Sequence, residues 1–198
     1  MRISKEKAAE NRDALIQAAS RLIRERGIDG VGVAEISKAA GLTHGALYAH
    51  FRSKEELALA ALAHGLEETC AALGAAGADG VAGLGSFLDG FLSPSTRDDY
   101  AGSCPIAASA SEIGRQERAI SACFSEKYLE MVRAIERGMG TDGNSQARAM
   151  IIVAALVGVQ AVARGAAKGD PALSEEVLRA ARQVIGQAIA TPSHGAPQ

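Results

Sequence analysis

Aromatic residues are scarce in this chain, and tryptophan is absent. Phe and Tyr make up only 4% of the 198 residues, although 47% are hydrophobic. Much of that share is alanine, which favours helices that pack closely through small side chains. No run of short alternating segments indicates a series of β-hairpins. These shortages favour an all-α protein.

Cysteine is also scarce. Cys70, Cys104 and Cys123 form no CxxC pair and are odd in number, which argues against a disulfide framework and against a zinc site. No GxSxG or HExxH motif is present. We therefore expect no metal, no cofactor and no catalytic residues.

Long hydrophobic runs are missing as well. The most apolar segment, Ala149–Ala163, would be about 22 Å long as a helix, shorter than the ~30 Å hydrocarbon core of a membrane. We expect it to be a buried helix and the protein to have no membrane partner. No apolar run follows Met1, so a secretory signal is not expected and the cytoplasm is the expected location.

The formal charge is only −2, but it is unevenly distributed. Residues 1–54 contain 10 Lys or Arg and 6 Asp or Glu, a balance of +4, whereas the remaining residues contain 11 and 17, a balance of −6. This division places a positive field on the N-terminal part of the chain, as phosphate binding requires.

That N-terminal part contains two short amphipathic segments between Val33 and Lys54. Apolar residues recur at helical spacing and the pattern breaks once, at Gly41. Two short helices joined at a tight turn predict a helix-turn-helix. If Leu47 and Phe51 face the core, the residues near the start of the second helix remain free to enter a DNA groove.

The chemistry of these exposed residues suits DNA. The Thr43 hydroxyl can cap the second helix, and Lys54 adds a cation for the phosphates. The predicted DNA contacts are Thr43, His44, Gly45, Tyr48, Ala49, His50 and Lys54. Among them, we expect His44 to give specificity and Gly45 to permit close approach.

The segment IRERGIDGVGVAEISKAAGLTHGALYAHFRSKEEL, from Ile23 to Leu57, resembles the DNA-binding domain of the TetR/AcrR family of transcriptional regulators. The residues at the spacing of the family pattern are Gly27, Val33, Ile36, Ala40, Gly41, Leu42, Thr43, Gly45, Leu47, Tyr48, His50, Phe51, Ser53, Lys54 and Leu57. The likeness covers about the first third of the chain.

Two positions depart from the family pattern. Gly32 stands where relatives often have a Ser or Thr that caps the first helix of the motif. Ala49 stands where many have His or another polar residue, and it offers only a methyl group, for example to a thymine. Base recognition then depends more on His44 and Thr43.

The resemblance implies an N-terminal three-helix domain with a helix-turn-helix and a C-terminal helical domain for ligand binding and dimerisation. We predict boundaries at 1–53 and 54–190, with a disordered tail at 191–198. It also implies a homodimeric repressor that a small molecule of unknown identity releases from a palindromic operator in double-stranded DNA.

Helical periodicity continues through the second domain. We predict a helix that ends at Gly27, a helix from Lys54 to about Leu73 with Ser53 and Glu56 forming a capping box, and a loose segment from Gly74 to Gly85. We also predict a helix near Val81–Phe91 and a polar loop at Ser93–Gly102. Further helices are expected to begin at Pro105, Glu117, Asn144 and Ser174, the last capped by Ser174.

Several residues of this domain are candidates for a ligand site or a sensor. Cys104 precedes Pro105 at a helix start, where the helix N-terminus favours a thiolate; a small buried hydrophobic residue is the alternative interpretation. The other candidates are His64, Phe91, Phe124 and Tyr128, each of which could instead belong to the core.

The last two helices predict a dimer interface. The segment Met150–Val162 is apolar on nearly all sides, more than one monomer's core requires, and two such helices per chain resemble the four-helix interface of the family. The predicted interface residues are Ile152, Leu156, Val159, Val177, Ala181, Val184 and Ile185.

Three functions stay open on the sequence alone. The first is the ligand-responsive regulator, with redox or electrophile sensing through Cys104 as a variant of it. The second is a thiol enzyme built on Cys104, and the third is a helical interaction module without a ligand.

Overall fold

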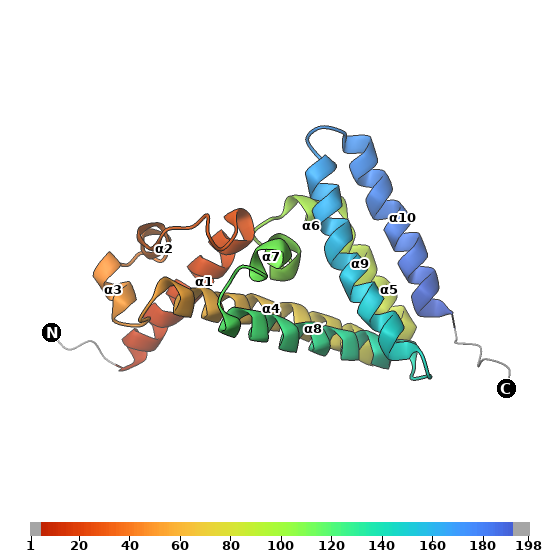
Figure 1. Ribbon diagram of the computed structural model, residues 1–198, viewed down its shortest axis with the longest axis horizontal. Coiled ribbons are helices and arrows are strands. Elements are labelled where there is room, and N and C mark those ends of the chain that lie inside the picture. Colours follow the sequence, from red (N-terminus) through yellow and green to blue (C-terminus); the bar gives the residue numbers. More distant parts are fainter. Residues whose placement is uncertain (1–4, 192–198) are drawn as a thin grey trace. The chain divides into compact units, whose positions relative to one another are not determined.

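The computed structural model describes residues 5–191, and these residues form helices and connecting turns without a strand (Figure 1). The predicted tail at 191–198 lies outside the described residues except for Thr191. The helices are α1 Lys5–Arg26, α2 Val33–Ala39, α3 His44–Tyr48, α4 Lys54–Ala78, α5 Gly80–Phe91, α6 Pro94–Asp98, α7 Pro105–Ile113, α8 Arg118–Met139, α9 Ser145–Ala166 and α10 Pro171–Ala190. The prediction of an all-α protein is confirmed.

The helices belong to two compact units. The first contains the described residues up to Glu67 together with Ala101–Phe124, and the second contains Glu68–Tyr100 and the described residues from Ser125 onward. Helices α4 and α8 each have residues in both units. A functional boundary between residues 53 and 54 stays a prediction, because compactness alone assigns no function.

The core of the first unit forms around α1. Its buried face contains Leu15, Ala18, Ala19, Leu22 and Ile23. Helix α1 ends at Arg26, and Gly27 follows with a φ of +80°, a left-handed conformation that favours glycine. The predicted helix end at Gly27 is confirmed.

The loose segment predicted at Gly74–Gly85 is wrong. Helix α4 continues to Ala78, and α5 begins at Gly80, whose φ of +68° makes the turn between them. Glycine lowers intrinsic helix propensity, but packing overrides it here. Gly77 lies against the backbone of Ala134 on α8, an approach that a side chain would prevent.

The polar loop predicted at Ser93–Gly102 is also partly wrong, because it contains the short helix α6. The Ser93 hydroxyl accepts a hydrogen bond from the Thr96 N–H at 3.1 Å, and Pro94 occupies the first helical position. A serine cap followed by proline is a helix-start signal, which the loop interpretation ignored.

In the second unit, α9 packs against α10 and α10 against α5. The buried Gln160 side chain of α9 donates to the carbonyl oxygen of Phe91. The Arg164 guanidinium donates to the carbonyl oxygens of Arg97 at 3.0 Å and of Thr96 at 3.3 Å. These bonds fix α9 to the end of α5 and to α6.

The cap of α10 differs from the prediction. Asp170 caps this helix, since its carboxylate accepts from the Leu173 N–H at 3.0 Å. Ser174 is instead buried within the helix, and its hydroxyl donates to the carbonyl oxygen of Ala163 at 2.7 Å. Ser174 therefore joins α10 to α9 and does not begin a helix.

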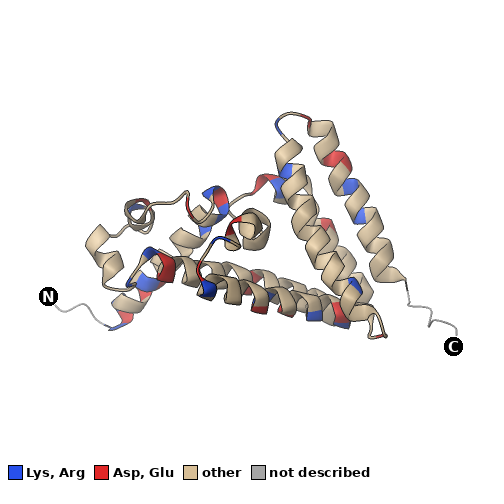
Figure 2. Ribbon diagram, viewed as in Figure 1, with Lys and Arg blue, Asp and Glu red and all other residues tan. Residues whose placement is uncertain are grey.

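Helix α9 begins close to the predicted start at Asn144, but it is more exposed than the predicted buried helix. At 22 residues it is long and apolar enough to cross a membrane by length and composition alone, and 33% of its most apolar window is buried. Its charged residues, Arg148 and Arg164, lie toward its two ends (Figure 2). Core helices of soluble proteins have the same composition, so these properties indicate a large apolar surface and do not by themselves indicate a membrane.

We predict opposite effects for two glycine substitutions in α4. A Cβ at Gly77 would overlap the carbonyl oxygen of Ala134, whereas a Cβ at Gly74 meets no atom within 4 Å. Gly77→Ala should lower the free energy of unfolding by about 1–3 kcal/mol. Gly74→Ala should raise it by roughly 0.5–1 kcal/mol, because it gains helix propensity without a clash.

Urea denaturation of the two variants measures this difference. Both substitutions change propensity alike, so the comparison isolates the packing of α4 on α8. Equal stability of the two variants would contradict the observed approach.

Candidate nucleic-acid interface

The predicted helix-turn-helix is present in the first unit as α2 and α3. Helix α2 contacts α1, and α3 contacts α2. The turn between them closes with two backbone hydrogen bonds, from the Leu42 N–H to the Ser37 carbonyl at 2.8 Å and from the Gly41 N–H to the Lys38 carbonyl at 3.1 Å. Gly41 has a φ of +69°. This is the arrangement of a Schellman motif, so Gly41 sets the angle between the helices.

The recognition helix α3 begins at a threonine cap, as the sequence predicts. The Thr43 hydroxyl accepts a hydrogen bond from the Ala46 N–H at 3.2 Å. Within the motif, Leu47 and Phe51 are completely buried, and the Arg12 guanidinium of α1 lies 4.9 Å from the centre of the Phe51 ring. Because both apolar side chains face inward, the polar start of α3 faces outward.

The predicted contact residues are accessible. Thr43, His44, Gly45, Tyr48 and Ala49 are exposed, whereas His50 and Lys54 are half-buried. The rings of His44 and Tyr48 meet edge to face with their centres 5.2 Å apart. The structure thus places these residues on α3, in the turns that flank it and at the start of α4, and their contacts with DNA stay a prediction.

The first helix of the motif has a glycine cap. Gly32 is extended, and its carbonyl accepts from the Glu35 and Ile36 N–H groups, both at 3.1 Å. No side chain caps α2, as the departure from the family pattern implies. Glu35 instead pairs with Arg26 at the end of α1, an exposed ion pair that adds little stability.

The start of α4 carries a modified capping box. The Ser53 hydroxyl accepts from the Glu56 N–H at 3.2 Å, as predicted. The Glu56 carboxylate accepts from the Arg52 N–H at 2.7 Å, one residue before the position that a capping box normally uses. The interface therefore connects to α4 through a fixed turn.

Charges at this turn modify the prediction for Lys54. Hydrogen bonds to its own backbone and to Ser53 lower the pKa of Glu55 below its usual value. Glu55 therefore remains ionised beside Lys54 and reduces its local positive field. Two exposed cations, Lys38 on α2 and Arg52 after α3, are candidates for phosphate contacts that the sequence prediction omits, although their place within the motif could have indicated them.

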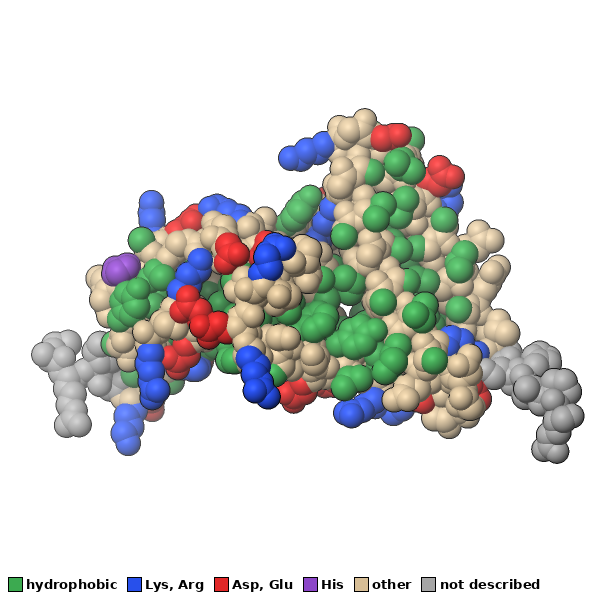
Figure 3. All heavy atoms as spheres, viewed as in Figure 1, with side chains coloured by type: hydrophobic (Ala, Val, Ile, Leu, Met, Phe, Trp, Pro, Cys, Tyr) green, Lys and Arg blue, Asp and Glu red, His purple; other side chains and the backbone are tan. Residues whose placement is uncertain are grey.

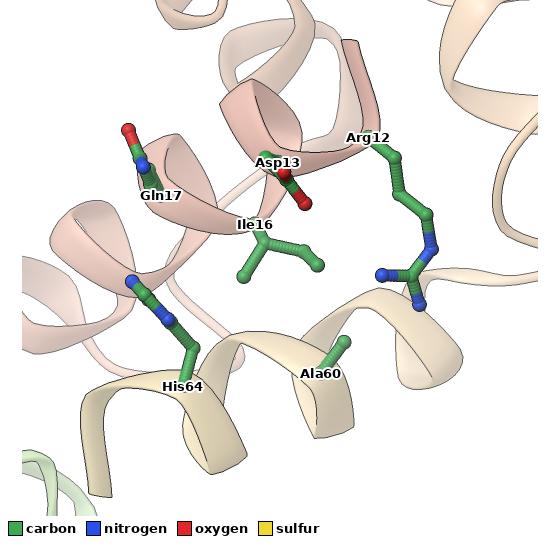
Figure 4. A pocket seen from close by; sticks show the side chains of 6 residues that line it. All are labelled: Arg12, Asp13, Ile16, Gln17, Ala60 and His64. Atoms are coloured by element: carbon green, nitrogen blue, oxygen red, sulfur yellow. The ribbon is translucent and has the colours of Figure 1, made fainter. Parts of the chain in front are cut away.

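One ligand candidate, His64, lines a pocket of the first unit (Figure 4). The pocket has a volume of about 420 Å³ and lies between α1 and the part of α4 before residue 67. Ile16 and Ala60 form its apolar part, and polar side chains surround them: Arg12, Asp13, Gln17 and His64.

The other ligand candidates are divided between the two units. Cys104 is buried at 6% exposure and occupies the N-cap position of α7 in the first unit, which also contains Phe124. In the second unit, the Tyr128 hydroxyl donates to the Met150 carbonyl at 2.7 Å, and burial raises the pKa of Tyr128. Phe91 stacks on Phe87 with ring centres 5.5 Å apart. Tyr128 and Phe91 therefore have structural contacts whether or not they meet a ligand.

The predicted dimer residues divide by burial. Ile152, Leu156 and Ile185 are buried inside the subunit, so they are not available to form the surface of a dimer interface. Val159, Val177 and Ala181 are half-buried, and Val184 is 64% exposed. The prediction omits Ile151, which is 70% exposed. An all-apolar helix gives no sequence signal for which side faces outward.

The sequence comparisons support this geometry. A family model for "Bacterial regulatory proteins, tetR family" matches residues 15–61. The HTH-type transcriptional regulator TtgR of Pseudomonas putida is 44% identical over 69 residues, which are 35% of this chain and 32% of TtgR. The alignment with TtgR thus spans about a third of that protein's length.

A longer sequence match reaches beyond this domain. The HTH-type transcriptional regulator LmrA of Bacillus subtilis is 28% identical over 145 residues, which are 71% of this chain and 77% of LmrA. The crystal structure of the reduced form of NemR from E. coli has a TM-score of 0.78 and covers 93% of this chain and 99% of that one. At 18% identity, this likeness shows a common fold alone. The sequence match shows a domain of the tetR family of bacterial regulatory proteins at residues 15–61, and the likeness to NemR shows a common fold over most of the chain.

Proposed function

We propose that this protein is a homodimeric transcriptional repressor that binds a palindromic operator in cytoplasmic DNA and releases it when a small molecule binds. The observation that carries this proposal is the recognition helix α3, which Leu47 and Phe51 hold while its polar start is exposed. The thiol-enzyme alternative is not retained, because the relatives are transcriptional regulators.

The exposed start of α3 suits a major groove. His44 is the candidate for reading base edges, since its imidazole can donate or accept a hydrogen bond. Gly45 beside it has no side chain to hold the backbone away from the bases. Thr43, Tyr48 and Lys54 are candidates for phosphate contacts, which set register more than specificity.

The outer sides of α9 and α10 support a dimer. Apolar side chains spread over both helices (Figure 3), and their most exposed large members are Ile151, Val162, Leu173 and Val184. Exposed apolar surface of this extent is typical of protein interfaces. Two copies that hold their recognition helices about 34–36 Å apart would match consecutive major grooves.

Ligand response is supported by the course of the chain. Helix α4 starts beside the recognition helix and continues without a break into the second unit. A ligand that favours another position of this helix would change the spacing of the two recognition helices. A coupling free energy of about 1–3 kcal/mol would change operator affinity by one to two orders of magnitude.

We expect His44→Ala and Tyr48→Ala to weaken DNA binding in different ways. His44→Ala should lose about 1–3 kcal/mol of affinity for the operator and little for unrelated DNA, because a base contact is removed. Tyr48→Ala should weaken binding to all sequences, because a phosphate contact is removed. Fluorescence anisotropy with DNA from upstream of the protein's own gene measures both effects, and the exposed residue Lys168 provides the control Lys168→Ala.

Tyr48→Phe removes the hydroxyl and keeps the ring, so its affinity for DNA shows which of the two groups makes the contact. Absence of binding by the wild-type protein at low salt would refute the proposed function. Equal losses on operator and unrelated DNA for His44→Ala would refute the specificity role of His44.

We expect Ile151→Glu and Val184→Glu to convert the dimer into monomers. A carboxylate at the centre of an apolar interface loses its hydration without gaining a partner, which should raise the dimer dissociation constant by about a hundredfold or more. Sedimentation velocity measures the assembly. Val81→Glu on α5 replaces another exposed apolar residue, 44% exposed, and should leave the dimer intact; equal dissociation by this control would contradict the assignment.

A second candidate is thiol sensing by Cys104 within the same regulator. Its position at the N-cap of α7 favours a thiolate through the helix dipole. Cys104→Ser should then abolish any loss of DNA binding caused by an oxidant or electrophile, while Cys123→Ser should preserve it. A response that survives Cys104→Ser would remove Cys104 from the mechanism.

A further inference from the structure

Helix α7 contacts the turn that leads into the helix-turn-helix. This turn, residues 27–32, connects α1 to α2. A hydrogen bond joins Ile28 in the turn to Glu112 on α7, and these two residues lie 84 positions apart in the sequence. Helix α7 also packs against α1 within the first unit (Figure 1). Around the turn, α7 and the residues that flank it form hydrogen bonds through polar and charged side chains.

The central contact is made by the Glu112 carboxylate. Its Oε2 accepts a hydrogen bond from the Ile28 N–H at 2.6 Å, and a Cβ at Gly27 would overlap its Oε1. Gly27 has a φ of +80°, which favours glycine, and the absence of a side chain there lets the carboxylate approach the backbone. The turn is thus shaped around one carboxylate from α7.

Two further hydrogen bonds lie on either side of this contact. The Arg24 guanidinium donates to the Ser103 carbonyl at 3.3 Å. The Gln116 side-chain amide donates to the two Asp29 carboxylate oxygens at 3.3 and 3.4 Å. Of the three contacts, only that of Glu112 reaches a backbone group of the turn, and at 2.6 Å it is also the shortest.

The turn in question positions α2. Ile28 and Val31 within it are buried at 3% and 1% exposure, and α2 begins two residues after Val31. Helix α2 contacts both α1 and α3. A change in the turn would therefore alter the angle at which the motif leaves α1, and with it the orientation of the recognition helix.

From these contacts we infer that Glu112 is a positioning residue for DNA binding, which acts by fixing the turn between α1 and α2. This inference rests on the proposed function, because it assigns Glu112 a role in operator affinity. Glu112 is not itself proposed to contact DNA, and its effect passes through Ile28 to α2.

The test compares three variants of the full-length protein. Glu112→Ala removes the acceptor, and Glu112→Gln retains a carbonyl oxygen for the Ile28 N–H. Ser109→Ala is a matched control on the same helix, because the Ser109 hydroxyl is buried and donates to the Pro105 carbonyl of its own helix at 2.7 Å. Each variant is assayed at a temperature where its circular dichroism shows it fully folded.

We expect Glu112→Ala to weaken operator binding by about tenfold, the effect of losing one hydrogen bond to a charged group. Glu112→Gln should recover most of that loss, and Ser109→Ala should change affinity by less than about twofold although it lowers thermal stability. Amide hydrogen exchange at Ile28 should accelerate in Glu112→Ala and much less in the other two variants.

The outcomes separate this inference from the proposed function. The positioning role would be overturned if Glu112→Ala bound the operator as tightly as the wild-type protein. It would also be overturned if Ser109→Ala lost as much affinity as Glu112→Ala, or if Glu112→Gln recovered none of the lost affinity. If the wild-type protein binds no DNA, the proposed function fails together with this role. Slow Ile28 exchange that Glu112→Ala leaves unchanged would show that Glu112 does not hold the turn at all.

Discussion

Helix α3 depends on the burial of Leu47 and Phe51. At five residues, it is far below the length at which a helix is stable by itself in water. Its stability comes from the apolar side chains on its inner side and from the Thr43 cap at its start. These interactions lie on the inner side and at the cap, so the outward-facing side chains do not hold the helix in place. Those positions can therefore have residues that suit contact with DNA. A short helix can therefore present a surface for recognising a DNA sequence although it would not be stable by itself.

The distinction between interactions of sequence neighbours and interactions of distant residues explains what could be predicted from the sequence. Gly27, Gly41 and Thr43 were predictable because a helix end, a left-handed turn and an N-cap are each set by neighbouring residues. The identity of the motif followed from the spacing of such residues. Local chemistry therefore predicted the first unit's helix-turn-helix and the accessibility of its candidate contacts.

Features that depend on distant residues could not be predicted in this way. Gly77 indicates a loop by propensity, yet it lies within α4 because Ala134 packs against it. Ser174 has the chemistry of a cap, but it bonds to Ala163 on another helix. Ile151 and Ile152 are adjacent and chemically alike, and only the packing of α9 decides that the first is exposed and the second is buried.

The discontinuity of the first unit has a consequence for how the chain is made. Glu112 emerges from the ribosome 84 residues after Ile28, which corresponds to roughly 4–17 s at ordinary rates of synthesis. Once Lys54 has been added, the helix-turn-helix is complete in sequence but still lacks its partner on α7, while residues that belong to the second unit are being added between them. A fragment that ends at residue 53 would remain permanently in this early condition. Transfer of the helix-turn-helix to another protein would thus keep the Glu112 contact only if two separate pieces of this chain were moved together.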